Sequence, residues 1–256
     1  MNDPSRPAFA TLAWALASGG NLTGRERRSL LAPILRTTVA YTTGRLRMAL
    51  GRRPARRATL DLARVRWPDT RLAREAEREC RGTLSAAMAG HSFRTFVFGL
   101  ALSELDEKPV DLEELYVGSL LHDLALEAPT PGRCFAVVGA ERARALLLAA
   151  GADDAQAARI AEGIALHISP GIGFERGPLA PLIAGGALID LAGLRLAELP
   201  PELVAAAFER WPRARCKRHL ATCWRREARA VPQGRAAATE RYALFSLVVR
   251  LAPFAE

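Results

Sequence analysis

The sequence has few cysteines and no long uncharged apolar run, and each shortage excludes a class of protein. Four cysteines in 256 residues are too few for a disulfide scaffold, and none stands in a C-x-x-C pair. They indicate reduced thiols and a cytoplasmic protein. The longest largely apolar stretch, residues 178–194, is interrupted by Asp190. No segment therefore reaches the roughly 18 uncharged apolar residues that a membrane span needs.

Aromatic residues are also scarce, at 6% of the chain, whereas 25% of the residues are charged and 50% are hydrophobic. This balance is typical of a globular protein with a sizeable core rather than a disordered chain. The apolar stretch AFATLAWALASGG (residues 8–20) is long enough for the core of a signal peptide. However, Asp3 accompanies Arg6 before it and arginine-rich sequence follows it, so we do not expect a secretion signal.

The basic charge is concentrated at the two ends of the chain. The formal net charge is +9, and residues 1–60 hold 11 arginines against only Asp3 and Glu26. Residues 61–209 hold 14 basic and 22 acidic side chains, and residues 210–256 hold 11 basic and 3 acidic ones. Chemistry located in the mildly acidic middle is therefore not explained by the basic isoelectric point.

Hydrophobic periodicity is helical almost everywhere, with no sustained alternation of the kind that marks strands. Glycine- and proline-containing breaks separate expected helices at residues 71–80, 84–105, 111–126, 137–149, 153–167, 179–197, 201–210, 214–229 and 236–250. We predict an all-α fold. Charge and turn composition both shift near residue 60, which predicts a basic helical extension over residues 1–60. A helical domain is expected over residues 61–256, with its motif core at 84–195 and C-terminal helices at 201–250.

Only four histidines are present, and three of them fall on the inward pattern of predicted helices. His91 opens a helical face that also carries Arg94. His122 and Asp123 are adjacent near the end of the next helix, about 100° apart, so both can reach one ion. His167 follows Ile160 and Ile164 at helical spacing, which predicts that it faces inward.

Asp190 is a carboxylate inside an otherwise apolar helix, LIAGGALIDLAGLRL. The small residues Gly186, Ala187 and Gly193 lie one turn away, and we expect them to leave room for an ion or ligand. Burying a charge costs several kcal/mol unless it is paired or bound to a metal. Taken singly, His91 reads equally well as a core histidine, Asp123 as a helix-end residue, and Asp190 as the partner of Arg195 or Arg176.

Together, His91, His122, Asp123 and Asp190 offer two imidazoles and two carboxylates to one divalent ion. This donor set suits Zn, Fe, Mn, Co or Ni, with positions left open for water. Such an ion lowers the pKa of coordinated water and so supplies a nucleophile. We expect His167 to act as a further ligand, a general base or a substrate contact, with a core role as the alternative. Arg94 is expected to orient a small polar substrate, or else to pair with Glu114.

The order H…HD…D resembles the HD superfamily of metal-dependent hydrolases over residues 84–195. The segments HSFRTFVFG and LYVGSLLHDLAL look most like the branch that contains cyanamide hydratase. The resemblance implies a helical HD domain with His91, His122, Asp123 and Asp190 as ligands of one divalent metal. It also implies hydrolysis of phosphate esters, the usual superfamily reaction, or addition of water to a nitrile.

The sequence departs from the superfamily pattern after the HD pair. Ala125 stands where a glycine is common, and Leu126 stands where many phosphohydrolases carry a lysine that holds phosphate. Some members use a glutamate one turn after the aspartate as a base. Glu127 is the corresponding candidate here, although it is four residues after Asp123 rather than three.

Two further features have other interpretations. Cys216, His219 and Cys223 share one helical stripe, for which core packing is a better explanation than a second metal site. The basic residues 1–60 could contact nucleic acid or an anionic membrane, which would suit a catalytically degenerate HD module. We favour packing of this extension on the domain or on a partner subunit, and its charge also favours self-association with the acidic middle.

Overall fold

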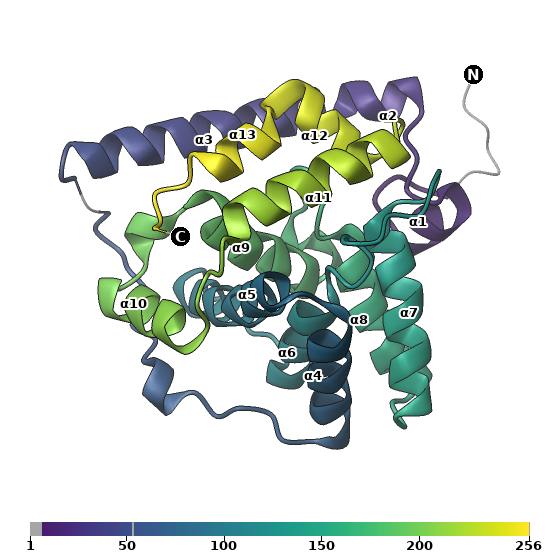
Figure 1. Ribbon diagram of the computed structural model, residues 1–256, viewed down its shortest axis with the longest axis horizontal. Coiled ribbons are helices and arrows are strands. Elements are labelled where there is room, and N and C mark those ends of the chain that lie inside the picture. The colour runs from purple at the N-terminus through teal and green to yellow at the C-terminus, as the bar shows by residue number, and fades with distance from the viewer. Residues whose placement is uncertain (1–6, 53, 256) are drawn as a thin grey trace.

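The computed structural model describes residues 7–52 and 54–255 (Figure 1). Over these residues the chain forms helices and turns without a strand, which confirms the all-α prediction. The charged start of the predicted extension, with Asp3 and Arg6, lies outside the described residues. Within them, no helix is both long enough and apolar enough to cross a membrane.

The helices follow one another with short connections. In chain order they are α1 (Leu12–Ser18), α2 (Gly24–Ser29), α3 (Leu31–Ala49), η1 (Leu62–Arg64), α4 (Arg71–Thr83), α5 (Ala86–Leu105), α6 (Leu112–Leu121), α7 (Phe135–Ala149), α8 (Asp154–Leu166), η2 (Phe174–Arg176), α9 (Leu179–Ala192), η3 (Leu196–Glu198), α10 (Pro201–Arg210), α11 (Cys216–Ala230), α12 (Arg235–Ala243) and α13 (Phe245–Arg250).

Three predicted helices were too long, and in two of them a residue with a positive φ marks the end. The helix expected to reach residue 126 ends at Leu121, and a turn follows it. The helix expected to reach residue 197 ends at Ala192, because Gly193 adopts a left-handed φ of 74° that closes it. The helix expected over 236–250 is divided by Leu244, whose φ is 49°.

The centre of the fold is the contact between α5 and α9, and glycine makes it close. A Cβ atom added to Gly186 on α9 would lie 2.2 Å from the carbonyl oxygen of Thr95 on α5. The sequence predicts that Gly186 leaves empty volume beside Asp190. In the structure it admits the backbone of the neighbouring helix instead, so the small residue serves packing.

The predicted N-terminal extension is packed onto the domain. Trp14, Leu22, Leu30 and Ile34 are buried in the same hydrophobic core as the residues of α5 and α9. α1 contacts α8, and α3 contacts α12. In Figure 1, α3 lies along one side of the molecule together with α12 and α13, so these segments cover the central helices.

Candidate metal centre

Three histidines and one aspartate converge from three helices. His91 lies in the second turn of α5, whose start is capped by Ser85. His122 and Asp123 come directly after α6, and His167 comes directly after α8. All four side chains are buried.

The Nε2 atom of each histidine faces the Asp123 carboxylate. The distances are 3.6 Å from His91 and 3.3 Å from His122 to Oδ2, and 3.8 Å from His167 to Oδ1. Metal–ligand bonds of about 2.1 Å at tetrahedral angles would separate an imidazole nitrogen and a carboxylate oxygen by about 3.4 Å. His91, His122 and Asp123 also hold their ligand atoms within 4.8 Å of one another. The spacing of these three residues is that of ligands around one ion, and His167 lies outside this group.

The other nitrogen of each imidazole is fixed by an acceptor. Nδ1 of His122 donates to the carbonyl oxygen of Ser119, and Nδ1 of His167 donates to that of Ile164, each at 2.7 Å. These carbonyls belong to helix C-termini, where the last carbonyl groups have no partner within the helix. Both helix ends therefore orient a histidine and direct the negative end of a helix dipole toward the place where a cation would bind.

Asp190 orients His91 from behind. Its Oδ2 accepts the Nδ1 proton of His91 at 2.8 Å. The same carboxylate accepts two hydrogen bonds from Arg94, at 2.8 and 2.9 Å, and one from Arg213 at 2.7 Å. Asp190 also lies near Cys216, in a second group whose ligand atoms are within 4.8 Å. Because both oxygens are already engaged, the structure places Asp190 behind His91 rather than among the direct ligands expected from the sequence.

Arg94 does not face the cavity that contains the histidines. Its guanidinium is fully buried and donates to the carbonyl oxygen of Trp211 at 2.8 Å in addition to Asp190. Burial disfavours the charge of Asp190, but Arg94 and the other donors keep the pKa of this carboxyl far below its usual range. The structure thus places Arg94 against Asp190, whose charge it neutralises, and not among the residues that line the cavity. Glu114, the other predicted partner of Arg94, pairs instead with Arg159.

Glu127 also points away from the metal centre. Its Oε2 accepts a hydrogen bond from the backbone amide of Ser85 at 2.8 Å, and its Oε1 contacts Nε2 of His219. The same His219 nitrogen lies 3.6 Å from Sγ of Cys223. Glu127 therefore links the start of α5 to α11, and the predicted role as a base near Asp123 has no geometric support.

The protonation states of His91, His167 and Asp123 suit metal binding, whereas that of His122 opposes it. Burial holds the pKa of His91 below its usual value and, with help from His122, lowers that of His167 to about 3. Burial opposes charge on Asp123, yet the neighbouring imidazoles, His122 foremost, lower its pKa to about 2. Burial also opposes charge on His122, but Asp123 raises its pKa. Neutral imidazoles and an ionised carboxylate are the forms that bind a metal.

A largely apolar cavity of about 310 Å³ opens above these four side chains. Its walls are aliphatic and aromatic, with hydroxyl groups from a few threonines, Ser169 and Tyr41. Asp123 is its only carboxylate, and among the described residues no lysine or arginine lines it. The cavity is covered by α3, through Ile34, Thr37, Thr38 and Tyr41, and by α12 and α13.

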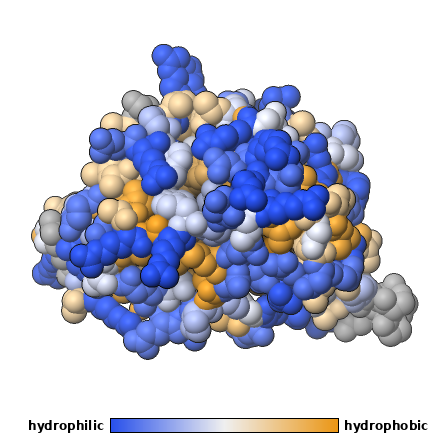
Figure 2. Space-filling model, turned by 90° about the horizontal axis from the view of Figure 1, so that it is seen from below, coloured by the Kyte–Doolittle hydropathy of each residue, from blue (hydrophilic) through white to orange (hydrophobic). Residues whose placement is uncertain are grey.

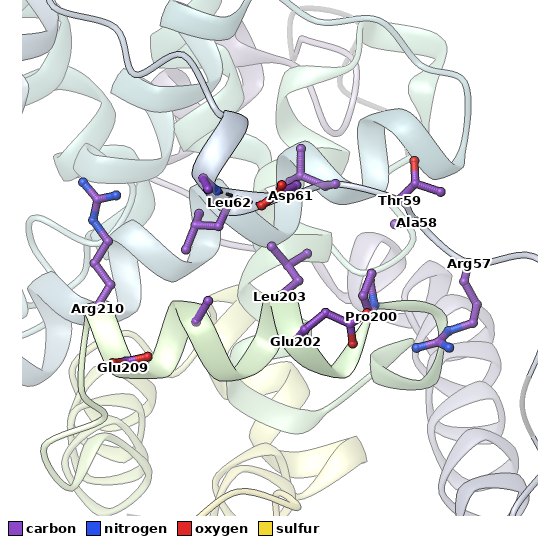
Figure 3. A pocket seen from close by; sticks show the side chains of 13 residues that line it. Arg57, Ala58, Thr59, Asp61, Leu62, Pro200, Glu202, Leu203, Glu209 and Arg210 are labelled. Carbon is purple, nitrogen blue, oxygen red and sulfur yellow. Dashed lines mark hydrogen bonds between the residues drawn. The ribbon is translucent and has the colours of Figure 1, made fainter.

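A second, larger cavity of about 920 Å³ lies between residues 57–63 and α10 (Figure 3). Three of its charged residues have structural partners: Asp61 caps η1, and Arg57 donates to the carbonyl oxygen of Leu199 at 2.8 Å. Arg210 lies over the ring of Trp67. No group of potential metal ligands found among the described residues includes a residue of this cavity. We therefore place the functional site at the histidines.

One buried atom carries the test of whether a metal fits. Nε2 of His91 is buried and has no hydrogen-bond partner. A buried polar atom without a partner lowers the stability of the folded state. Nε2 of His91 faces the Asp123 carboxylate, near the imidazole nitrogens of His122 and His167. A cation held by His91, His122 and Asp123 would satisfy this atom, so these three residues fit a metal ion, with Nε2 of His167 nearby at 3.8 Å from Oδ1 of Asp123.

Models of known protein families do not match this chain, and neither do the curated proteins. The case for its function therefore rests on the geometry of the site.

Sequence reasoning missed Arg213 and the covering role of α3. Arg213 lies in a short turn, RWPRARC, where nothing in the local pattern indicates a buried partner 23 residues earlier in the chain. For α3, the apolar residues among the arginines could have indicated a helix with a buried side, because Ile34 and Tyr41 are seven residues apart.

Proposed function

We propose that this chain is a metal-dependent enzyme that hydrates or hydrolyses a neutral, largely apolar small molecule. The observation that carries the proposal is the convergence of three imidazole Nε2 atoms on the Asp123 carboxylate, at the base of a cavity. Zn, Fe, Mn, Co and Ni all suit three imidazoles and one carboxylate. The resemblance of the H…HD…D order to the HD superfamily supports the same proposal.

A divalent ion held there supplies the Lewis acidity that makes water nucleophilic near neutral pH. The chain provides the rest. Asp123 and the three Nε2 atoms bind the ion, while Asp190, Ser119 and Ile164 keep a proton on Nδ1 of the histidines so that each Nε2 lone pair is free. The apolar walls exclude bulk water and strengthen electrostatic interactions within the cavity.

The cavity favours a neutral substrate over a phosphate ester. A phosphate group needs cationic partners, and no arginine or lysine among the described residues lines the cavity. Arg94, which could have supplied such a charge, is committed to Asp190. This supports hydration of a nitrile or hydrolysis of a neutral carbonyl compound, and it counts against the phosphohydrolase alternative.

A substrate comparison tests the proposal. Protein loaded separately with each of the five metals would be assayed with cyanamide, longer alkyl nitriles, neutral esters and amides, and nucleoside monophosphates. We expect turnover of a neutral compound, its loss in Asp123→Ala, and its retention in His219→Ala, which removes the one histidine outside the centre. Turnover of the phosphate esters alone would contradict the proposed substrate class. Equal turnover by Asp123→Ala would contradict the proposed site.

A further inference from the structure

The exposed apolar side chains of this protein are not scattered. Among the described residues, nine of the eleven large apolar side chains that are exposed lie on two segments, α3 with its C-cap and residues 242–251. They are Leu31, Leu35, Val39, Leu46, Leu50, Tyr242, Leu244, Leu247 and Leu251. We call this set the α3–α13 face. Scattered exposed apolar residues are ordinary, but a gathered set marks an interaction surface.

On α3 the exposed apolar residues form one side of the helix. Leu31, Leu35, Val39 and Leu46 recur at helical spacing within an arc of about 80°. Arg36 and Arg47, both exposed, lie together on one side of this arc. The residues that line the metal cavity point to another side, so the helix has one apolar side toward the cavity and a second apolar side toward solvent.

The α3–α13 face lies directly outside the metal cavity. α3 and the segment from Thr239 to Val248 both line that cavity from within. Figure 1 shows α3, α12 and α13 together along the upper side of the molecule. Figure 2 views the molecule from below, and there hydrophilic side chains predominate, with apolar ones showing between them. The apolar surface is thus on the side where the cavity is covered.

The charge around this face restricts its partner. Residues 27–60 contain no aspartate or glutamate, and neither do residues 241–255, while both segments contain arginines. A second copy using the same face in a two-fold dimer would bring arginines against arginines. The exposed apolar side chains and the arginines around them fit a partner that has an apolar interior and a negatively charged surface. An anionic lipid bilayer has both properties.

We propose that the α3–α13 face docks this protein on an anionic lipid bilayer. Docking follows from the surface alone and does not depend on the proposed function.

Vesicle sedimentation tests the docking. The full-length protein would be mixed with vesicles of phosphatidylcholine, either pure or containing about one-third phosphatidylserine. We expect binding to the anionic vesicles in about 0.1 M salt, at least about tenfold weaker binding to the neutral ones, and weakening in about 0.5 M salt.

Two variants separate the apolar and the charged contributions. Leu35→Ser/Leu46→Ser changes side chains that are 64% and 60% exposed, so the fold should be unaffected, and vesicle affinity should fall at least about tenfold. Arg36→Gln/Arg47→Gln should lower the affinity by about tenfold and reduce its salt dependence. Leu148→Ser, at an exposed leucine on α7, is the matched control and should bind as the wild type does.

The outcome is independent of the metal. Asp123→Ala should lose metal and still bind vesicles, so failure of the proposed enzyme and failure of docking are distinguishable. Absence of wild-type binding to anionic vesicles would overturn the proposal, as would unchanged binding by Leu35→Ser/Leu46→Ser. A dimer that this variant abolishes, without vesicle binding by the wild type, would assign the face to a second copy instead.

Discussion

Asp190 accepts the Nδ1 proton of His91 at 2.8 Å, and this contact decides which nitrogen of His91 faces the cavity. The carboxylate is held in turn by Arg94 and Arg213. An aspartate inside an apolar helix is thus accounted for without direct coordination. Its effect on the metal is exerted through the orientation and basicity of one imidazole.

Asp190→Asn should therefore weaken metal binding by about 10- to 100-fold rather than abolish it. Asp123→Asn, which removes a direct ligand, should lower the affinity further. Competition with a chromophoric chelator measures both, with thermal unfolding recorded in parallel to identify the folded fraction. The reverse order, in which Asp190→Asn causes the greater loss in folded protein, would make Asp190 the ligand.

Arg94→Met tests whether this arginine is structural. Removing one partner of a buried ion pair leaves an uncompensated charge and costs about 3–5 kcal/mol. Because Arg213 still contacts Asp190, we expect the lower end of that range in urea unfolding. Arg56→Met breaks an exposed pair with Glu107 and should cost less than about 1 kcal/mol. A negligible stability loss for Arg94→Met together with a raised KM would restore the substrate-binding role.

Much of the candidate site could be predicted from spacing. His91 lies on an inward position of α5, whereas His122, Asp123 and His167 come directly after α6 and α8, and the apolar residues of these three helices share one core. Spacing could not show, however, which nitrogen of each imidazole donates a hydrogen bond and which one faces Asp123. That assignment depends on the Ser119 and Ile164 carbonyls, which become available only where α6 and α8 end.

Helix ends were the least predictable part of the fold, and three of the candidate metal ligands lie directly after them. The apolar pattern continues past Leu121 because Leu124 and Leu126 are buried in the turn that follows. Periodicity therefore could not show that the helix ends at Leu121, directly before His122. Likewise, the small residues near Asp190 could not show whether they admit a ligand or a helix backbone.

Gly186→Ala tests the close contact of α5 and α9. The new Cβ would meet two backbone atoms, the Thr95 oxygen at 2.2 Å and the Gly99 nitrogen at 2.8 Å. Backbone cannot move aside cheaply, so we expect a loss of about 3 kcal/mol, seen as a lower Tm. Gly82→Ala on α4 meets nothing within 4 Å and should raise stability by up to about 1 kcal/mol. A Tm for Gly186→Ala as high as that for Gly82→Ala would contradict the close contact of α5 and α9.

Glu227 on α11 should make stability fall as pH rises. It is buried; Oε1 accepts a hydrogen bond from the Phe135 amide at 2.9 Å, and Oε2 has no partner. Burial raises its pKa from 4.5 to about 7. Between these values the folded protein binds more protons than the unfolded chain, so ionisation costs stability as pH rises, with the full cost present above pH 7.

Glu227→Gln should remove that cost while keeping the acceptor for Phe135. The free energy of unfolding of the variant, relative to the wild type, should be near zero at about pH 4 and favour the variant by up to about 3 kcal/mol at about pH 8. Urea titrations over this range measure the difference, in which other titrating groups cancel. A difference that is independent of pH, or one that favours the wild type at high pH, would refute the assignment.

The most direct test of the whole account is the metal content of the protein purified without added metal. Elemental analysis should find about one equivalent of a transition metal in the wild type and in His219→Ala, and very little in folded Asp123→Ala. A wild type without stoichiometric metal that also fails to take up any of the five candidate ions, or an Asp123→Ala variant that retains a full equivalent, would contradict the proposed centre.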